Sequence, residues 1–413
     1  MKKDNILFLA ADTEKVFNEK QETVINNLRK GEFFDLASFS AENLAFWDAR
    51  FKGFCIYSEK QELLTKLQNL HPFYCESKEL KIIFSFSGLG NQHVDMGKTL
   101  YLQYDAFRKS LDYCFKIIES VSGLDLLPCL YPTEIGSSEN ELSEITIYQF
   151  VVFAFEYAMG QFLIELGLRP DFLVGYSFGE YLCACFSEMA TIEDIIRMLY
   201  IRGGLVCQTQ CGRMLSVPID KKTVREILGN SISIGIDNGE SCILSDEKSK
   251  IDEAEMVLKI RRILGVEVNG RYGFHSPLME WVGEAYEEAL ADIEFKAPQI
   301  PFLSNVTGSW FSIDEFCIPE YWSRQLKHEV LFHKCLTELN HIREGFFVDI
   351  GSGNEIGGLL TRHRGGNNKC IVSVAKRKNE NIDDIEVFTK AIIKLWENGI
   401  NMNYLKWWSI NQI

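Results

Sequence analysis

The stretch FLVGYSFGEYLCA (172–184) constrains the fold more than any other part of the chain. An apolar run stops at Gly175, turns through Ser177, and restarts after Gly179 with the pattern of a helix. G-x-S-x-G predicts a tight strand-to-helix turn that lifts the serine hydroxyl out of a sheet. The pentapeptide also occurs by chance, so its meaning depends on the rest of the chain.

Strand-like and helix-like segments alternate on both sides of this turn. KIIFSFSGLGNQ (81–92) and FFVDIGSGNEI (346–356) each consist of an apolar strand that breaks into a glycine-containing loop. Such alternation predicts a parallel sheet covered by helices on both faces. Functional sites of parallel sheets lie beyond the carboxyl ends of the strands. We therefore expect loop 88–92 and Ser177 to lie close together.

The chain divides into segments of different pattern. Residues 213–269 follow the order β-α-β-β-α-β, which predicts a ferredoxin-like subdomain inserted into the larger one. Residues 1–80 combine short apolar strands with amphipathic helices and predict a small α/β domain. The expected boundaries are 1–80 for this first domain, 81–212 together with 270–370 for the large subdomain, 213–269 for the small subdomain, and 371–413 for a C-terminal segment.

Composition excludes several classes of function. The formal net charge of −15 argues against a nucleic-acid partner, which requires basic surfaces. The 12 cysteines include no C-x-x-C pair and no Cys/His metal spacing, which favours reduced thiols and no metal site. We identify no secretory leader and no membrane-spanning segment, and we expect a cytoplasmic protein without membrane association.

A serine hydroxyl needs a base within hydrogen-bond reach to act as a nucleophile. Of seven histidines, His275 alone lies in the loop RYGFHSPLMEW that leads from the insert back to the large subdomain. A single histidine is often a structural or surface group. The expected topology nevertheless directs this one toward Ser177, which makes it the candidate base.

The motifs, taken in order, resemble the malonyl-CoA:acyl carrier protein transacylase family, and more closely the acyltransferase domains of polyketide synthases. Residues 1–80 resemble the linker domain that precedes such domains, and the C-terminal segment resembles the linker that follows them. The resemblance implies an α/β-hydrolase-like large subdomain with a ferredoxin-like insert. The motifs that carry it are FSFSGLGNQHVDMGKTLY, GYSFGE, IRGGLV, YGFHS, PFLSNVTG, YWSRQLKHEVLF and FVDIGSGN.

The resemblance implies a two-step acyl transfer. Ser177 would attack a thioester while His275 takes its proton, and the acyl-enzyme would then be released onto a second thiol. The backbone N–H groups of Phe178 and Leu89 would form the oxyanion hole. A backbone carbonyl at Gln325 would orient the histidine.

Arg202 matches the family's arginine position in the helix after the turn. Without that match, an arginine in an amphipathic helix is usually a solvated or salt-bridged surface group. With it, Arg202 would bind the free carboxylate of a malonyl-type acyl group by a bidentate pair. Related acyl hydrolases usually lack this arginine, so its presence favours a transferase.

Departures from the family pattern bear on the acyl pocket. Leu89 replaces the usual glutamine, and Tyr176 replaces the histidine before the nucleophile. Phe274 stands where malonyl-selective domains tend to have phenylalanine, which favours malonyl over an α-methyl-branched unit. Gln149 and Asn305 match positions near the pocket, although both also fit ordinary buried amides satisfied by the backbone.

Together these features predict a free-standing acyltransferase that acts in trans. It would move a malonyl or α-substituted malonyl unit from acyl-CoA or acyl-phosphopantetheine to carrier protein domains of a polyketide or hybrid peptide-polyketide synthase, without a bound cofactor. The basic stretch 361–378 is either a solvated face or a contact for an acidic carrier protein. The alternatives are an acyl hydrolase that clears stalled carriers and a non-catalytic docking protein.

Overall fold

The computed structural model describes residues 5–31, 33–76, 79–132, 142, 144–268, 270–312 and 318–411. The chain forms two compact units, each described here by itself. Unit 1 comprises residues 1–80, 163–169 and 388–413, and unit 2 comprises residues 81–162 and 170–387.

Unit 1 is built on a three-stranded antiparallel sheet of order β1-β2-β3. Thr13 caps the first helix by accepting a hydrogen bond from the Val16 N–H, and Gly31 ends it in the left-handed conformation. Apolar side chains such as Phe17 and Leu63 fill the core between sheet and helices. The strands are β1 (Asn5–Ala11), β2 (Phe51–Tyr57) and β3 (Phe73–Tyr74), and the helices are α1 (Glu14–Lys30), α2 (Leu36–Ala45), α3 (Lys60–Gln68), α18 (Tyr404–Asn411) and the end of α17 (Asp384–Glu397).

The main sheet of unit 2 is parallel throughout, with strand order β10-β5-β4-β11-β12. Its strands are β4 (Lys81–Phe86), β5 (Phe172–Gly175), β10 (Phe302–Leu303), β11 (Gly345–Asp349) and β12 (Ile371–Ser373). The expected C-terminal segment from residue 371 thus begins inside this sheet, because β12 pairs with β11.

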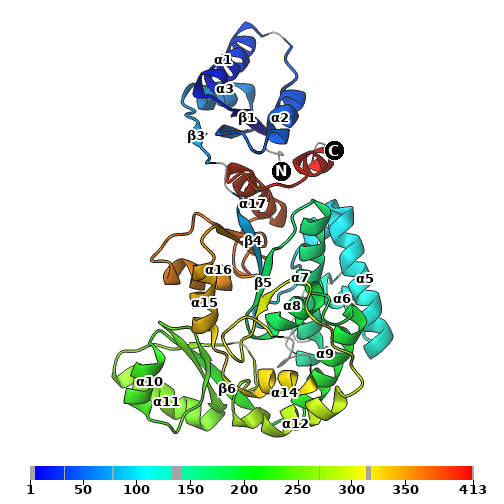
Figure 1. Cartoon of the computed structure of the whole chain (residues 1–413), viewed down its shortest axis with the longest axis vertical. Helices are drawn as coiled ribbons and strands as arrows, with labels where there is room; N and C mark the ends of the chain where they lie inside the picture. The colour runs from blue at the N-terminus through cyan, green and yellow to red at the C-terminus, as the bar shows by residue number, and fades with distance from the viewer. Residues whose placement is uncertain are drawn as a thin grey trace. The chain divides into compact units, whose positions relative to one another are not determined.

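Helices cover both faces of the parallel sheet, as Figure 1 shows. The helices α15 and α16 contribute to an apolar cluster with Ile83, Val174 and Phe347 of the strands. The helices of this layer and of the opposite one are α4 (Lys98–Gln103), α5 (Asp105–Ser122), α6 (Leu127–Leu130), α7 (Ile145–Glu165), α8 (Glu180–Phe186), α9 (Ile192–Val206), α12 (Glu280–Ala289), α14 (Pro319–Lys327), α15 (Phe332–His341) and α16 (Glu355–His363).

Within unit 2, a second sheet has strand order β7-β8-β6-β9 and only antiparallel pairs. The order of elements is β-α-β-β-α-β, the ferredoxin-like plan. Apolar side chains including Val224 and Leu258 pack the two helices onto the sheet. The elements are β6 (Gly212–Val217), α10 (Lys221–Leu228), β7 (Ile234–Asp237), β8 (Cys242–Glu247), α11 (Lys248–Ile260) and β9 (Val266–Glu267). The predicted fold class is confirmed.

Helix α7 bears on the expectation that no segment of the chain spans a membrane. Among the described residues it is the single helix long and apolar enough to cross a membrane, with 21 residues and a mean hydropathy of 1.4. However, 78% of its most apolar window is buried inside the protein, which is the behaviour of a core helix. Length and composition therefore give only weak evidence for a membrane span.

Candidate active site

Ser177 sits on a strained turn between β5 and α8. Its φ of 51° is left-handed, a conformation that side-chain-bearing residues adopt rarely and mostly at functional sites. A Cβ on Gly175 would lie 2.3 Å from the Glu180 nitrogen, and one on Gly179 would lie 2.2 Å from the Phe86 carbonyl oxygen. Both flanking glycines are therefore required by packing, which explains the G-x-S-x-G spacing.

The Ser177 hydroxyl faces the imidazole of His275. The distance from Ser177 Oγ to His275 Nε2 is 2.6 Å, although the two residues are 98 positions apart. The other ring nitrogen, Nδ1, lies 3.1 Å from the His328 carbonyl oxygen, and the His275 backbone N–H donates to the Leu326 carbonyl at 3.2 Å. A proton on Nδ1 satisfies the carbonyl and leaves the Nε2 lone pair for the serine.

The orientation of His275 involves a second backbone carbonyl besides the one expected at Gln325. The nearest carbonyl to Nδ1 belongs to His328, and the Gln325 carbonyl is the smaller of two backbone influences on the pKa of His275. His328 caps the end of α14 with non-helical dihedral angles, so its carbonyl is free of the helix and turns outward. The side chain of Gln325 instead donates to the Ser177 carbonyl at 2.8 Å.

Electrostatics keep His275 neutral. Burial, and secondarily the positive charge of Arg202, lower the pKa of His275 to about 4. The residue is only 5% exposed. A neutral imidazole at physiological pH can accept the serine proton, which is what a general base requires.

Arg202 is a buried cation enclosed by aromatic rings. Its guanidinium carbon lies 4.8 Å from the ring centroid of Phe274, 5.6 Å from that of Phe178 and 5.9 Å from that of Tyr181. Phe178 follows Ser177 and Phe274 precedes His275, so the guanidinium lies beside both expected catalytic residues. The site therefore combines a hydroxyl, a neutral base and a cation.

The hydrogen bonding of Arg202 is incomplete. Its Nη1 donates to the Gln149 Oε1 at 3.0 Å, whereas its buried Nε–H has no partner. Within the described part of the chain no carboxylate pairs with it. Gln149 donates in turn to the Leu199 carbonyl at 2.8 Å, and a Cβ on Gly203 would lie 2.3 Å from the Gln149 amide nitrogen. Gln149 thus holds one side of the guanidinium and Tyr181 also interacts with it, while the unpartnered Nε–H suits an anionic ligand.

The two expected oxyanion donors lie at the same sheet edge. Phe178 follows the nucleophile directly, and Leu89 lies three residues beyond Phe86, the register partner of Gly175 in β5. A Cβ on Gly88 would lie 3.1 Å from the Tyr176 ring, so the loop after β4 packs against the turn. Both backbones are thus placed at the carboxyl edge that carries Ser177.

Asn305 braces the turn from the loop after β10. Its Oδ1 accepts from the Ser177 N–H at 2.6 Å, and its Nδ2 donates to the Gly175 carbonyl at 2.8 Å. The Asn305 N–H donates to Glu180 at 2.9 Å. Asn305 therefore supports the backbone of the turn, and no contact within the described residues places its amide in an acyl pocket.

Tyr176 is buried directly before Ser177. It is 3% exposed, its ring packs edge-on against Phe332 at 4.7 Å, and its hydroxyl accepts from the Asn238 amide at 3.1 Å. The expectation that Tyr176 lies beside the acyl pocket stays a prediction, whereas Phe274 does contact the Arg202 cation.

Sequence reasoning missed Glu180, which is fully buried under the turn. Its carboxyl accepts from the Asn305 N–H and from the Tyr321 hydroxyl, and burial raises its pKa to about 7. The glutamate that ends GYSFGE was the available signal. No sequence signal pointed to the contact of the Gln325 side chain with Ser177 or of His328 with His275, because both depend on how α14 packs.

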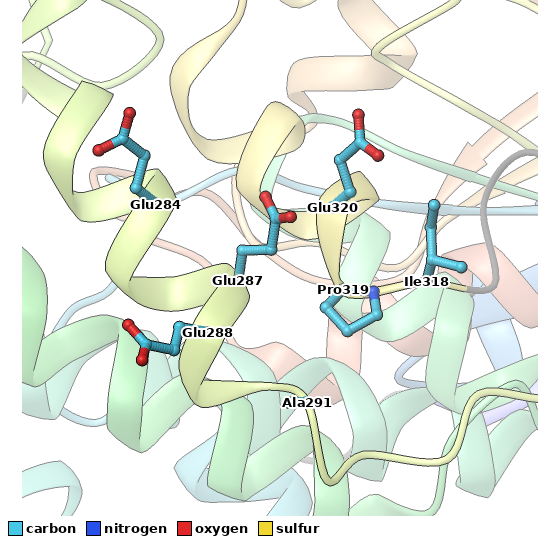
Figure 2. Close-up of a pocket in the computed structure, with 7 residues that line it drawn as sticks. All are labelled: Glu284, Glu287, Glu288, Ala291, Ile318, Pro319 and Glu320. Carbon is cyan, nitrogen blue, oxygen red and sulfur yellow. The ribbon is translucent and has the colours of Figure 1, made fainter.

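A second concave region lies away from these residues. A depression of about 540 Å³ lies between α12 and the start of α14, and Figure 2 shows the four carboxylates around it. None of the predicted site residues lines it, and its negative charge would repel an acyl-CoA or a malonyl group. It is lined by Glu284, Glu287, Glu288, Ala291, Ile318, Pro319 and Glu320.

Comparison with known proteins identifies the class. Residues 83–353 match the model of the acyl transferase domain family, and the chain therefore belongs to that family. The solved acyl transferase domain of ZmaA is 28% identical, with a TM-score of 0.89 over 98% of this chain and 96% of that one. The malonyl-CoA:acyl carrier protein transacylase of Xanthomonas oryzae, at 21% identity and a TM-score of 0.64, shares the fold over 73% of this chain and 96% of its own.

Two sequence relatives place the chain among acyltransferases of the polyketide synthase and malonyltransferase type. A phenolphthiocerol/phthiocerol polyketide synthase protein of Mycobacterium tuberculosis is 25% identical over 78% of this chain, which spans about a fifth (22%) of that relative. The polyketide biosynthesis acyltransferase homolog PksD of Bacillus subtilis is 26% identical over 74% of this chain and 96% of its own length. The predicted family is confirmed, and residues 83–353 form its acyltransferase domain.

Proposed function

We propose that this acyltransferase transfers a malonyl or α-substituted malonyl unit from a CoA or carrier thioester to the phosphopantetheine thiol of a synthase carrier protein. One observation carries the proposal. Ser177 Oγ lies 2.6 Å from a neutral His275, and the adjoining Arg202 keeps a buried N–H without an acceptor among the described residues. A substrate carboxylate supplies that acceptor.

The first half-reaction follows from these contacts. Ser177 Oγ attacks the thioester carbonyl carbon while its proton passes to His275 Nε2. In this proposal the Leu89 and Phe178 N–H groups bind the oxygen that becomes negative. The C–S bond then breaks, and the departing thiolate takes the proton from His275. The ester on Ser177 stays anchored by its carboxylate at Arg202.

The second half-reaction reverses the roles. A carrier thiol gives its proton to His275, its sulfur attacks the ester carbonyl, and Ser177 Oγ leaves with the proton returned by the imidazole. The Phe274 ring flanks the carboxylate position at Arg202, which supports malonyl over branched units. We further propose that the enzyme acts in trans on a separate carrier protein.

The test is acyl transfer from malonyl-CoA to a phosphopantetheinylated carrier protein. The wild type should load the carrier through an enzyme-bound ester, and Ser177→Ala should neither carry the ester nor load the carrier. Rapid release of free malonate without dependence on a carrier would instead identify a hydrolase. Absence of any bound ester from malonyl or substituted-malonyl donors would contradict the proposal.

A further inference from the structure

In the loop after β4, side-chain oxygens accept hydrogen bonds from the backbone N–H groups of Ser87 and Gly90. The Ser87 N–H lies 3.1 Å and 3.3 Å from the two carboxyl oxygens of Glu156, and the Ser87 hydroxyl also donates to that carboxyl. Glu156 belongs to α7 and is 1% exposed. A side chain from the core helix thus fixes the point where the loop leaves the strand.

The following N–H groups complete the pattern. The Gly88 backbone faces the Glu355 carboxyl, and the Gly90 N–H donates to the Gln92 Oε1 at 2.9 Å. The Leu89 N–H, between them, has no acceptor in the part of the chain that the structure describes. The Leu89 N–H, which lies at the expected oxyanion position, is therefore available to a ligand.

Glu156 is one of three neighbouring carboxyl groups. Burial raises the pKa of Glu156 well above its ordinary value and raises those of Asp349 and Glu355 to about 7. Within the described residues no cation pairs with Glu156 or Asp349. Burial is the largest cause of the shift at Glu156, and the carboxyl acts on the loop through its hydrogen bonds to Ser87.

Packing leaves no spare room beside Ser87, where the loop leaves β4. A Cβ on Gly351 would lie 2.3 Å from the Ser87 Cβ and 2.9 Å from a Glu156 carboxyl oxygen. A loop clamped in this way keeps its donor in place before the reaction, which is the condition for oxyanion stabilisation.

We propose that Glu156 is a positioning residue that holds Ser87 so that the Leu89 N–H points at the oxyanion of the reacting acyl group. The inference rests on the proposed acyl transfer at Ser177. Glu156 touches no substrate. It acts through the loop, and its loss would misplace a donor whose position controls the rate.

A matched pair of variants tests this role. Glu156→Met keeps the volume and removes the acceptor, whereas Glu156→Gln keeps both the volume and a carbonyl acceptor for Ser87. Asp349→Asn is the control, because Asp349 is buried in the same group but contacts Gly357 and Ser85 instead of the loop. Each folded variant is compared for malonylation of Ser177 and for phosphonylation of Ser177 by a fluorophosphonate probe.

We expect Glu156→Met to slow both reactions by on the order of 10²-fold, with KM for malonyl-CoA unchanged. Glu156→Gln and Asp349→Asn should keep rates close to those of the wild type. Wild-type rates in folded Glu156→Met, an equal loss in Asp349→Asn, or a comparable loss in Glu156→Gln would each overturn the inference. If Glu156→Met does not fold, a large loss of rate in Glu156→Gln would still overturn the inference.

The probe separates this inference from the proposed function. The fluorophosphonate requires only the serine, the histidine and the oxyanion donors, and needs no malonyl group. A wild type that reacts with the probe but never with malonyl donors would contradict the proposed substrate. The Glu156 comparison would then still be decided by the probe rates alone.

Discussion

Two buried cations, one in each unit of the molecule, show how the same kind of group can be structural or functional. Lys52 in unit 1 is fully buried, and its Nζ donates to the backbone carbonyls of Trp47 and Trp396, the latter at 2.7 Å. Arg202 in unit 2 is 4% exposed, donates to Gln149 and leaves its Nε–H without a partner among the described residues.

The surroundings of Lys52 and Arg202 also indicate a structural role for the first and a binding role for the second. Lys52 lies over the Trp396 ring with its charge directed at carbonyls of its own unit, and burial lowers its pKa. Arg202 lies among aromatic rings beside a serine and a histidine that are in contact. Burying a donor without an acceptor costs free energy unless a ligand supplies one. The comparison therefore assigns Lys52 to the fold and Arg202 to binding.

The largest effect is expected for Arg202→Met. Removal of two charge-assisted hydrogen bonds to a carboxylate should lower malonyl transfer by about 10²- to 10³-fold. The melting temperature should not fall, because the variant removes a cation that the protein itself leaves partly unpaired. Steady-state transfer assays and thermal unfolding measure the two quantities. Unchanged malonyl transfer in Arg202→Met would show that Arg202, like Lys52, serves the fold and does not bind the substrate.

The second effect should appear in stability alone. Lys52→Met removes the donor of the Trp47 carbonyl and one of the two donors of the Trp396 carbonyl, and it should lower the free energy of unfolding by about 1–3 kcal/mol. Transfer activity per folded molecule should match the wild type. Urea unfolding together with active-site titration measures both. A Lys52→Met protein that is stable but inactive would break the comparison.

The third prediction concerns pH. His275 has its pKa lowered to about 4, so the rate at Ser177 should stay level down to about pH 5 and fall only near pH 4. Because Arg202 contributes to this shift, Arg202→Met should move the acid limb upward, and Lys52→Met should not. The limb should stay below the ordinary value of 6.5, because burial is the larger cause. Probe labelling of Ser177 across pH measures the limb.

The same group links pH to stability. The pKa of His275 is lower in the folded state than the ordinary 6.5, so between pH 6.5 and 4 the unfolded chain binds more protons. The contribution of His275 to stability is therefore complete above pH 6.5 and is lost as the pH falls toward 4. His275→Gln should show less acid destabilisation across this window in urea unfolding.

The smallest effect is expected for Phe274→Ala. The ring lies 4.8 Å from the Arg202 guanidinium, and loss of this cation–π contact of about 1 kcal/mol should slow malonyl transfer about fivefold. The space that opens should improve methylmalonyl transfer relative to malonyl. Competition between the two CoA donors measures the ratio. An unchanged ratio would remove Phe274 from the specificity site.

The sequence predicted those parts of the molecule that are encoded locally. The Gly175–Gly179 turn, the alternation of strands and helices and the order of the insert's elements all follow from neighbouring residues, and the structure has the predicted fold class. The register of Phe86 with Gly175 then brings the loop after β4 to the turn, as the parallel-sheet argument predicted.

The details that sequence reasoning did not reach depend on packing between distant elements. The His328 carbonyl reaches His275 because of where α14 ends, and the Tyr176 hydroxyl meets Asn238 from a separate segment. The clamp of Glu156 on Ser87 joins residues 69 positions apart. No local sequence pattern distinguishes a glutamate that binds a distant loop from one that lies on the solvent-exposed face of its helix.

The central claim is that Ser177, His275 and Arg202 act together on an acyl group that carries a carboxylate. Its most direct test is intact-protein mass spectrometry after brief exposure to equal concentrations of malonyl-CoA and acetyl-CoA, with the adduct mapped to a peptide. The wild type should carry malonyl on Ser177 almost alone, and Arg202→Met should carry chiefly acetyl at the same serine. An adduct on another residue, or the same malonyl preference without the guanidinium, would contradict the account.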